Sequence, residues 1–450
     1  MREKIKPSIL PGFMELGPRE QLIFEDIVSK MIQVYKRNGC LPMDTPIIEK
    51  EEILLAKSAG ETEKQVYRID KEKMKQALRF DLTVPFARYV VQHMNELAFP
   101  FKRYQLGKVY RGERNQKGRY REFYQLDIDI VNPNRLDIGN DAYVINLAAQ
   151  AFESIGLTNY KFQISNRKIL AGVLDVLEIE TQQEVMGLID KYDKMGGESC
   201  MEQLQVLIGR EKADIIQNFI EIQGTVEDCI EMLKMQFGEL AKYCKSETTI
   251  SQGYVSIKEG IDELEDVMGM VDAFGVRKEN AIIDLKIIRG LDYYTGTVFE
   301  TVLVGNEVYG SICSGGRYDN LTGLYTEQKM PGVGISIGIT RLFFVLGEIG
   351  FIEKYSLVDQ MTYLICPIGN TLKVCIEINR ILQQQGILSE VYMNGAPLKK
   401  QLSYANTRGI NQVILVGEAE WLNGEVIFKD MLTGTQIKKN WGEWKQGISK

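Results

Sequence analysis

The sequence has one histidine, His93, and its seven cysteines are scattered without any C-x-x-C spacing. The single histidine excludes a histidine-rich metal site, and we expect His93 to be structural. The odd, dispersed cysteines predict reduced thiols in the core. No apolar run approaches the roughly 20 residues that span a bilayer, and no apolar segment follows the charged start REKIK. We therefore expect a cytoplasmic protein with no membrane contact.

Glycine-rich phosphate loops are also missing. Neither G-x-x-x-x-G-K-[ST] nor a G-x-G-x-x-G turn after a strand occurs: GVGISIG has the wrong glycine spacing, and GERNQKGR lacks the serine or threonine. If this chain binds phosphate, side chains must hold it.

Positive charge is scarce overall and concentrated in one place. Lysine and arginine number 54 against 61 aspartate and glutamate, a net charge of −7. Five cations nevertheless fall between positions 111 and 121, namely Arg111, Arg114, Lys117, Arg119 and Arg121. Guanidinium groups match phosphate oxygens in a planar fork, so the segment predicts an anion site. A solvated basic hairpin is the alternative interpretation.

Hydrophobic periodicity predicts the elements around this segment. Spacing of 3.6 predicts an amphipathic helix over 18–38, and two prolines confine the strand that follows to a sheet edge or to a place where chains meet. Residues 77–94 predict a strand, a turn at Pro85 and a helix. Alternation predicts antiparallel strands over 104–110 and 123–131, with the cations in the loop between them.

The 450 residues suffice for two or three domains. Composition predicts one domain from 1–165 and 256–348, a helical insertion over 166–255, a linker over 349–359 and a small domain over 360–450. Within the first domain, GSICSGGRYDNL predicts a glycine-rich turn, and GVGISIGITRL predicts a strand leading into a helix. Strand and helix patterns alternate after 360, which favours a mostly parallel α/β sheet. This last part holds ten Lys/Arg and seven Asp/Glu, a net +3, so the remainder carries −10.

Several segments resemble a known family. YRGERNQKGRYREFYQLDIDI resembles motif 2 of class II aminoacyl-tRNA synthetases in the form of histidyl-tRNA synthetases, IIRGLDYYTGTVFE resembles their histidine-binding signature, and GVGISIGITRL resembles motif 3. SICSGGRYDNL and LKKQLSYANTRGINQVILVGE are also similar to the family. The resemblance implies an α+β catalytic domain with the class II antiparallel sheet and flanking helices, a helical insertion, and a C-terminal α/β anticodon-binding domain.

The resemblance implies that ATP, with Mg²⁺, activates L-histidine as histidyl-adenylate and that the product is charged tRNA(His). It assigns catalysis to Arg111 and Arg289, with Arg289 bridging the histidine carboxylate and the α-phosphate. The alternative for Arg289 is an ion pair with Asp284 or Asp292. The implied ATP-binding residues are Arg111, Glu113, Arg119, Phe123, Gly338 and Arg341. It does not identify Mg²⁺ ligands.

The resemblance also implies a histidine site, with more residues than the ATP site. It comprises Asp81, Leu82, Thr83, Arg111, Gln125, Asp129, Arg289, Tyr293, Tyr294 and Tyr318. The first three would receive the ammonium group, and Asp129, Tyr294 and Tyr318 would recognise the imidazole. Period 2 independently places Gln125, Asp127 and Asp129 on one strand face. Gly315 and Gly316 would let the backbone approach the ligand, or would form a tight turn.

The resemblance also implies partners. Arg114 and Gln116 would reach the tRNA acceptor end, and Lys399, Lys400 and Arg408 would contact tRNA through the C-terminal domain. Residues 43–48 resemble motif 1, which implies a homodimer. The competing hypothesis is a histidine-sensing regulatory subunit of ATP phosphoribosyltransferase, which shares the fold. Retention of Arg111, Arg289 and Arg341 speaks against it.

Overall fold

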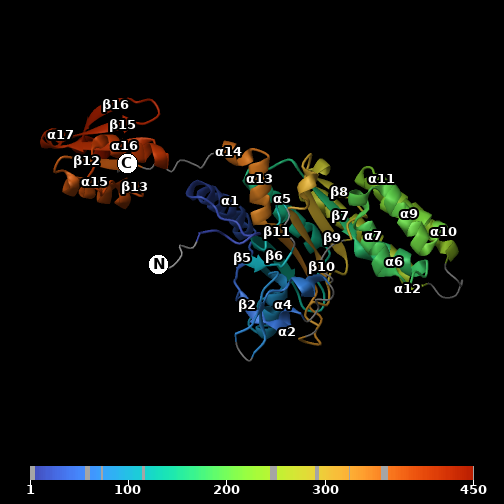
Figure 1. Ribbon diagram of the computed structural model, residues 1–450. Coiled ribbons are helices and arrows are strands. Elements are labelled where there is room, and N and C mark those ends of the chain that lie inside the picture. The colour runs from blue at the N-terminus through green and yellow to red at the C-terminus, as the bar shows by residue number, and fades with distance from the viewer. Residues whose placement is uncertain are drawn as a thin grey trace. The chain divides into compact units, whose positions relative to one another are not determined.

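The computed structural model describes residues 6–55, 61–71, 74–113, 117–243, 251–288, 293–323, 325–355 and 363–448 (Figure 1). The chain divides into two compact units, Met1–Tyr355 and Ser356–Lys450. Within the described ranges no helix is both long and apolar enough to cross a membrane.

The first unit is built on an eight-stranded sheet of order β1-β5-β6-β11-β10-β9-β7-β8. The inner pairings are antiparallel, and only the edge pairs β1–β5 and β7–β8 are parallel. The strands are β1 (Leu41–Pro42), β5 (Phe101–Tyr110), β6 (Glu122–Val131), β7 (Tyr160–Asn166), β8 (Ala281–Ile283), β9 (Thr297–Leu303), β10 (Cys313–Tyr318) and β11 (Gly332–Gly338). The predicted antiparallel pair is confirmed as β5 and β6, and Pro42 lies on an edge strand, as expected.

Helices cover one face of this sheet because alternate strand residues are apolar. The even-numbered residues Leu126, Ile128 and Ile130 of β6 are fully buried. Tyr104, which pairs with Ile128, lies 6.2 Å ring to ring from Tyr35 of α1. The helices on this side are α1 (Pro18–Arg37), α5 (Gly139–Ser154) and α13 (Ile339–Glu348). The odd-numbered residues of β6 are left for the opposite face.

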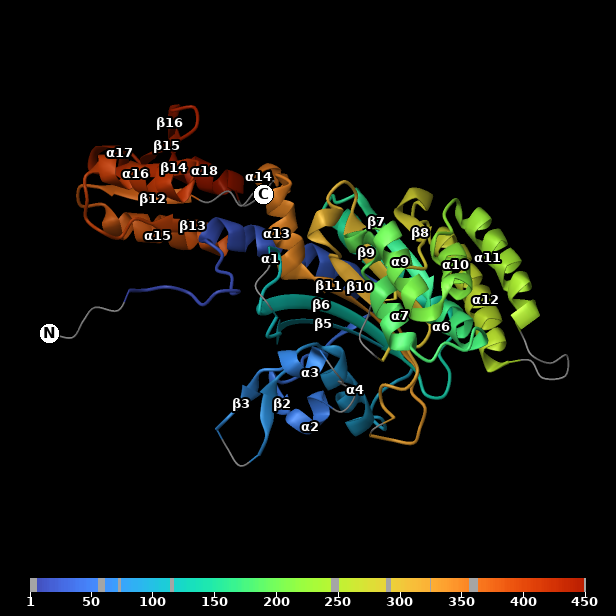
Figure 2. The ribbon, with the colours of Figure 1, turned by 45° about the vertical axis from the view of Figure 1, so that its right-hand side comes forward.

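Smaller elements lie over that opposite face (Figure 2). A sheet of order β2-β4-β3, with β2 (Ile48–Lys50), β3 (Arg68–Ile69) and β4 (Gln76–Leu78), accompanies α2 (Glu51–Leu54), α3 (Glu61–Gln65) and α4 (Thr83–Gln92). The guanidinium of Arg103 on β5 lies 4.6 Å from the Phe86 ring centre of α4. The turn predicted at Pro85 is wrong, because α4 starts two residues earlier. Proline is tolerated in a first turn, where the missing N–H has no intrahelical partner.

Helices fill the chain between β7 and β8. They are α6 (Arg167–Val176), α7 (Gln182–Ile189), α8 (Tyr192–Met195), α9 (Gly197–Ile208), α10 (Arg210–Ile220), α11 (Val226–Leu240) and α12 (Gln252–Ala273). Two glycines allow α6 and α12 to pack closely, since a Cβ at Gly172 would lie 2.5 Å from the Gly253 carbonyl oxygen. The expected boundary at 255 falls inside α12, which also packs against α5.

The glycine-rich turn predicted for GSICSGGRYDNL is wrong, because these residues form β10 in the middle of the sheet. A Cβ at Gly315 would lie 2.2 Å from the Gly334 carbonyl oxygen, and one at Gly316 would lie 2.7 Å from the Thr297 carbonyl oxygen. Both glycines therefore let neighbouring strands and side chains of this chain approach. The six described cysteines are free and buried, as expected, and Cys244 lies outside the described residues.

The second unit has a five-stranded sheet of order β13-β12-β14-β15-β16. The pairings of β12 with β13 and β14 are parallel, whereas β14–β15 and β15–β16 are antiparallel. The predicted mostly parallel sheet is therefore only half right. Its elements are β12 (Tyr363–Ile368), α15 (Leu372–Gln384), β13 (Ser389–Val391), α16 (Leu398–Arg408), β14 (Gln412–Gly417), α17 (Glu418–Leu422), β15 (Glu425–Asp430), β16 (Gln436–Asn440) and α18 (Trp441–Ile448).

Candidate active site

The β5–β6 hairpin presents Arg111 at the end of β5. Its Nε donates to the Phe80 carbonyl oxygen at 2.9 Å, and its guanidinium lies 5.2 Å from the Phe123 ring centre. The Nε of Arg121 donates to the Glu113 carbonyl oxygen at 3.1 Å. Backbone acceptors thus orient both cations. Arg114 and Gln116 lie outside the described residues.

Arg119 and Arg341 approach from the loop and from α13. The Nη1 of Arg119 lies 3.1 Å from Oε2 of Glu113, and Arg341 donates to the carbonyl oxygens of Gly118 at 3.2 Å and Ser311 at 2.7 Å. Burial lowers the pKa of Arg341, and the positive charges of Arg119 and Arg111 lower it further. A polyanion bound among these groups would relieve their mutual repulsion. Gly338, also expected at the ATP site, ends β11 and caps α13.

The odd-numbered face of β6 carries a buried acidic cluster. Gln125, Asp127 and Asp129 are at most 8% exposed and share this face, as predicted. Asp129 is held on both sides: Tyr318 donates its hydroxyl to Oδ1 at 2.8 Å, and Nη2 of Arg103 lies 2.5 Å from Oδ2. Burial raises the pKa of Asp129 to about 7, opposed by Arg103 and reinforced by Asp127.

Asp81 faces the same cluster from the start of α4. Its Oδ1 accepts from the Val84 N–H at 3.1 Å, and the Tyr293 hydroxyl lies 3.4 Å from its Oδ2. Burial raises its pKa to about 6; the Val84 N–H and Arg111 oppose this rise, and Asp127 adds to it. The Leu82 carbonyl oxygen accepts from Arg103 at 3.1 Å, which ties α4 to β5.

Three tyrosines close the group. The ring centres of Tyr293 and Tyr294 are 5.0 Å apart, and those of Tyr293 and Tyr318 are 5.9 Å apart, both edge to face. The structure thus brings together Asp81, Asp129 and the three tyrosines from four separate segments. Arg289 and Asp292 lie outside the described residues. The other suggested partner of Arg289, Asp284, accepts from Gln163 Nε2 at 2.9 Å and lies 3.4 Å from Lys286.

Residue-type patterns alone missed Arg103, which is fully buried against Asp129. Its signal was present in FKRYQLGKVY, where Arg103 and Gln105 interrupt an apolar strand at period 2. Recognising the pair required the hairpin register, in which Arg103 lies opposite Asp129 and Gln105 opposite Asp127. An eleven-residue loop does not determine that register.

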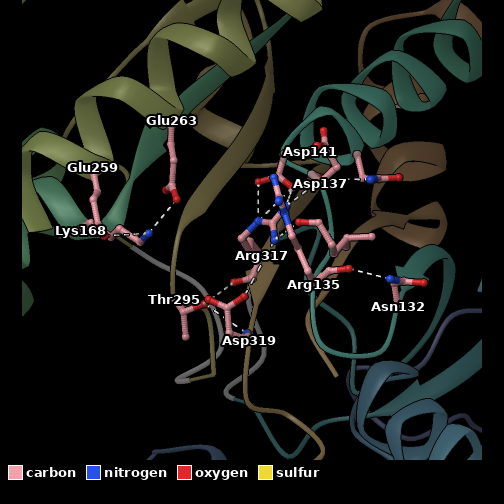
Figure 3. A network of polar contacts seen from close by, with 12 residues as sticks. Asn132, Arg135, Asp137, Asp141, Lys168, Glu259, Glu263, Thr295, Arg317 and Asp319 are labelled. Atoms are coloured by element: carbon pink, nitrogen blue, oxygen red, sulfur yellow. Dashed lines mark hydrogen bonds and ion pairs between the residues drawn. The ribbon is translucent and has the colours of Figure 1, made fainter. Parts of the chain in front are cut away.

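A second buried ion pair supports β10 from the helix side (Figure 3). Arg317, next to Tyr318, donates to Asp141 of α5 at 2.7 and 3.0 Å and to the Leu136 carbonyl oxygen at 3.1 Å. Thr295, next to Tyr294, donates to Asp319 at 2.6 Å. These contacts anchor the backbone on either side of the tyrosine cluster.

In the second unit, the three expected tRNA-binding cations lie on one helix, α16. Lys399, Lys400 and Arg408 are all exposed, and Arg408 Nη1 donates to the Tyr404 hydroxyl at 3.3 Å. Elsewhere, the ring of His93, which caps the end of α4, packs against Tyr89 in a tilted arrangement with ring centres 4.5 Å apart, and this contact is consistent with the structural role expected of it. Among the described residues, no three histidine, cysteine, aspartate or glutamate side chains form a group that could hold a metal ion.

Two family models divide the chain between them. Residues 12–342 match the histidyl-tRNA synthetase model, and residues 362–450 match the anticodon binding domain. The chain belongs to the histidyl-tRNA synthetase family.

Relatives extend the match over the whole length. A histidine–tRNA ligase of Clostridium acetobutylicum is 60% identical over 440 residues, covering 98% of this chain and 99% of that protein. One of Clostridium tetani is 46% identical and covers 97% and 96%. The crystal structure of histidyl-tRNA synthetase from Nostoc sp. PCC 7120 matches with a TM-score of 0.85 at 32% identity, covering 99% of each chain.

Proposed function

We propose that this chain ligates L-histidine to tRNA(His), using ATP to form histidyl-adenylate. The observation that carries this proposal is full-length similarity to histidine–tRNA ligases, at 60% identity in one case. A protein described as an ATP phosphoribosyltransferase regulatory subunit/histidyl-tRNA synthetase, from Bacillus halodurans, is only 20% identical, with a TM-score of 0.71. A similarity at this level shows only a shared fold, so it does not favour the regulatory alternative.

Histidine would occupy the buried acidic cluster. Asp81, Leu82, Thr83 and Gln125 would surround the ammonium group, which a carboxylate can neutralise. Asp129, Tyr294 and Tyr318 would bind the imidazole, whose two nitrogens need one acceptor and one donor. The Tyr318–Asp129 hydrogen bond and the Arg103 contact support this assignment, because they hold an acceptor in place before the ligand enters. Tyr293 would orient Asp81.

ATP would bind among the cations of the β5–β6 hairpin. Arg111 would hold the α-phosphate, Arg119 with Glu113 the γ-phosphate and adenine, and Phe123 would stack on the base. Arg341 lies in the first turn of α13, just after Gly338, and would lie against the nucleotide. The clustering of Arg341 with Arg119 and Arg111 supports this set, since its pKa stays lowered even though Glu113 and Glu300 raise it, and a bound anion would compensate the remaining charge.

Mg²⁺ would arrive with ATP. Glu113 and Glu300 both lie close enough to Arg341 to raise its pKa, and carboxylates with phosphate oxygens are the ligands that Mg²⁺ takes in nucleotide sites. Glu113 and Glu300 would hold the ion through their carboxylate oxygens. When bound, the ion would neutralise charge on the β and γ phosphates.

The attack joins two anions, the histidine carboxylate and the α-phosphate. Arg111 and Arg289 would stabilise the charge that develops as the new P–O bond forms and pyrophosphate leaves. The role of Arg289 in this step is proposed from the sequence resemblance. A ribose hydroxyl of the tRNA would then attack the carbonyl carbon of the mixed anhydride, forming the ester as the bond to the phosphate breaks and AMP leaves. The enzyme supplies position and charge, and no protein nucleophile is required.

The tRNA would contact Arg114 and Gln116 near the acceptor end and Lys399, Lys400 and Arg408 in the anticodon-binding domain. We retain a helical insertion over 166–255, a linker over 349–359 and a cytoplasmic location as parts of the proposal. Exposed Ile47 and Ile48 support a homodimer through residues 43–48, the segment resembling motif 1.

Histidine-dependent exchange of pyrophosphate into ATP, followed by charging of purified tRNA(His), tests the function. We expect exchange with histidine and little with other amino acids. Binding of histidine without exchange would favour the regulatory alternative. A protein ending at residue 355 should keep exchange and lose efficient charging. If such a folded protein charges tRNA fully, the role of the second unit is wrong.

A further inference from the structure

The histidine-binding residues assigned above leave out Asp127, although its side chain is only 2% exposed. Asp127 lies in the middle of β6, between Gln125 and Asp129 on the same face. The Ser336 hydroxyl, opposite it on β11, hydrogen-bonds its carboxylate. Its Oδ1 has no hydrogen-bond partner among the residues that the structure describes.

A second acceptor on this face is also unpaired. The Nε2 of Gln125 donates to Ser336 Oγ at 2.6 Å, while Gln125 Oε1 has no donor in the described part of the chain. Residues i and i+2 of a strand point to the same side, about 7 Å apart. A buried acceptor without a donor loses the hydrogen bond that water gave it in the unfolded chain. Two such acceptors at neighbouring positions indicate a missing donor.

A positively charged donor suits this position best, because burial still raises the pKa of Asp127 even though Arg103, Arg111 and Arg79 lower it. The negative charge of Asp127 raises the pKa of both Asp81 and Asp129, so the three carboxylates repel one another. Arg103 contacts Asp129, and the Tyr293 hydroxyl reaches Asp81 Oδ2 only at 3.4 Å. An ammonium group offers three N–H donors and one positive charge to Asp81, Gln125 and Asp127.

We propose that Asp127 binds the α-ammonium group of L-histidine, together with Asp81 and Gln125. This inference rests on the proposed function and adds one carboxylate to its histidine site. Asp127 then serves to distinguish an amino acid from the analogue in which a hydroxyl replaces the ammonium group. A neutral hydroxyl gains little from a second buried carboxylate, whereas the cation gains a charge-assisted hydrogen bond.

Calorimetric titration of the full-length protein with L-histidine and with L-imidazolelactate, its hydroxyl analogue, tests the proposal. We expect the unmodified protein to prefer histidine. Asp127→Asn keeps the shape and removes the charge, so histidine should bind about 10- to 100-fold more weakly. The affinity for imidazolelactate should change by less than about threefold. Asp127→Ser provides a second variant if the amide does not fold.

The matched control is Asp284→Asn, a buried aspartate just after the edge strand β8, which four strands separate from β6; it should leave both affinities unchanged. The inference is overturned if a folded Asp127 variant keeps the preference for histidine. Equal weakening of both ligands would also overturn it, because Asp127 would then only support the strand. If the unmodified protein fails to bind histidine, the proposed function itself is wrong, and the variants are not needed to see it.

Discussion

The hydroxyl of Tyr318 donates a buried 2.8 Å hydrogen bond to Asp129, whose other oxygen lies 2.5 Å from Arg103. Three strands, β10, β6 and β5, supply these side chains. Because both carboxylate oxygens are engaged, the orientation of Asp129 is set by the sheet. The proposed imidazole acceptor is thus preorganised, which reduces the ordering required when histidine binds.

Tyr318→Phe removes the hydroxyl that orients Asp129. We expect the KM for histidine in pyrophosphate exchange to rise about tenfold, equivalent to about 1.4 kcal/mol, with a smaller change in kcat. Tyr143→Phe is the matched control, because it loses a 3.0 Å hydrogen bond to the Asn38 carbonyl oxygen on the helical side. An unchanged KM for histidine in Tyr318→Phe would contradict the assigned role.

Asp81→Asn should alter how stability depends on pH. The folded pKa of Asp81 is raised to about 6 from 3.8, so its protonated form favours the native state. That contribution is complete below about pH 4 and is lost as pH rises through 6. The asparagine amide does not ionise, so its contribution does not change with pH. The free energy of unfolding of the variant, relative to that of the unmodified protein, should therefore rise by about 2–3 kcal/mol between pH 4 and 8. Urea unfolding at several pH values measures this, and a pH-independent difference would refute it.

Arg341→Lys should weaken polyphosphate binding. The guanidinium donates to the Gly118 and Ser311 carbonyl oxygens, and a lysine cannot keep both contacts while facing a phosphate. We expect the KM for ATP to rise about 10- to 100-fold. The increase in Tm that pyrophosphate gives the unmodified protein should shrink. Arg88→Lys, which lies on α4 beside Glu49, should leave both measurements unchanged. The same Tm increase in Arg341→Lys would exclude a phosphate role.

The Arg317–Asp141 pair should behave as a buried structural ion pair. Asp141→Asn leaves the Arg317 charge buried without its partner and should lower the free energy of unfolding by about 3–5 kcal/mol. A double variant, Arg317→Met with Asp141→Leu, removes both charges and should lose less. Denaturant unfolding compares them. Arg317→Met and Asp141→Leu are also measured singly, and a double variant that loses the sum of these two single effects would show that the pair is not coupled.

Local patterns in the sequence predicted α1 and the β5–β6 hairpin correctly, because amphipathic periods of 3.6 and 2 depend only on near neighbours. The same alternation placed Gln125, Asp127 and Asp129 on one face. The basic cluster, too, was visible as a run of charges. These features arise from neighbouring residues and needed no knowledge of distant contacts.

Longer-range features required the tertiary structure. The three glycines of GSICSGGRYDNL indicate a turn locally, yet Cys313–Tyr318 form the central strand β10, where Gly315 and Gly316 let the backbones of β11 and β9 approach closely. The antiparallel half of the second sheet depends on β15 and β16 pairing beside β14. The contact of Arg103 with Asp129 depends on the register of the β5–β6 hairpin. The contacts of Asp81 and Asp129 with the tyrosine cluster depend on packing between segments more than 100 residues apart. Sequence alone determined which side chains face one way on each strand, whereas tertiary packing decided which of them meet.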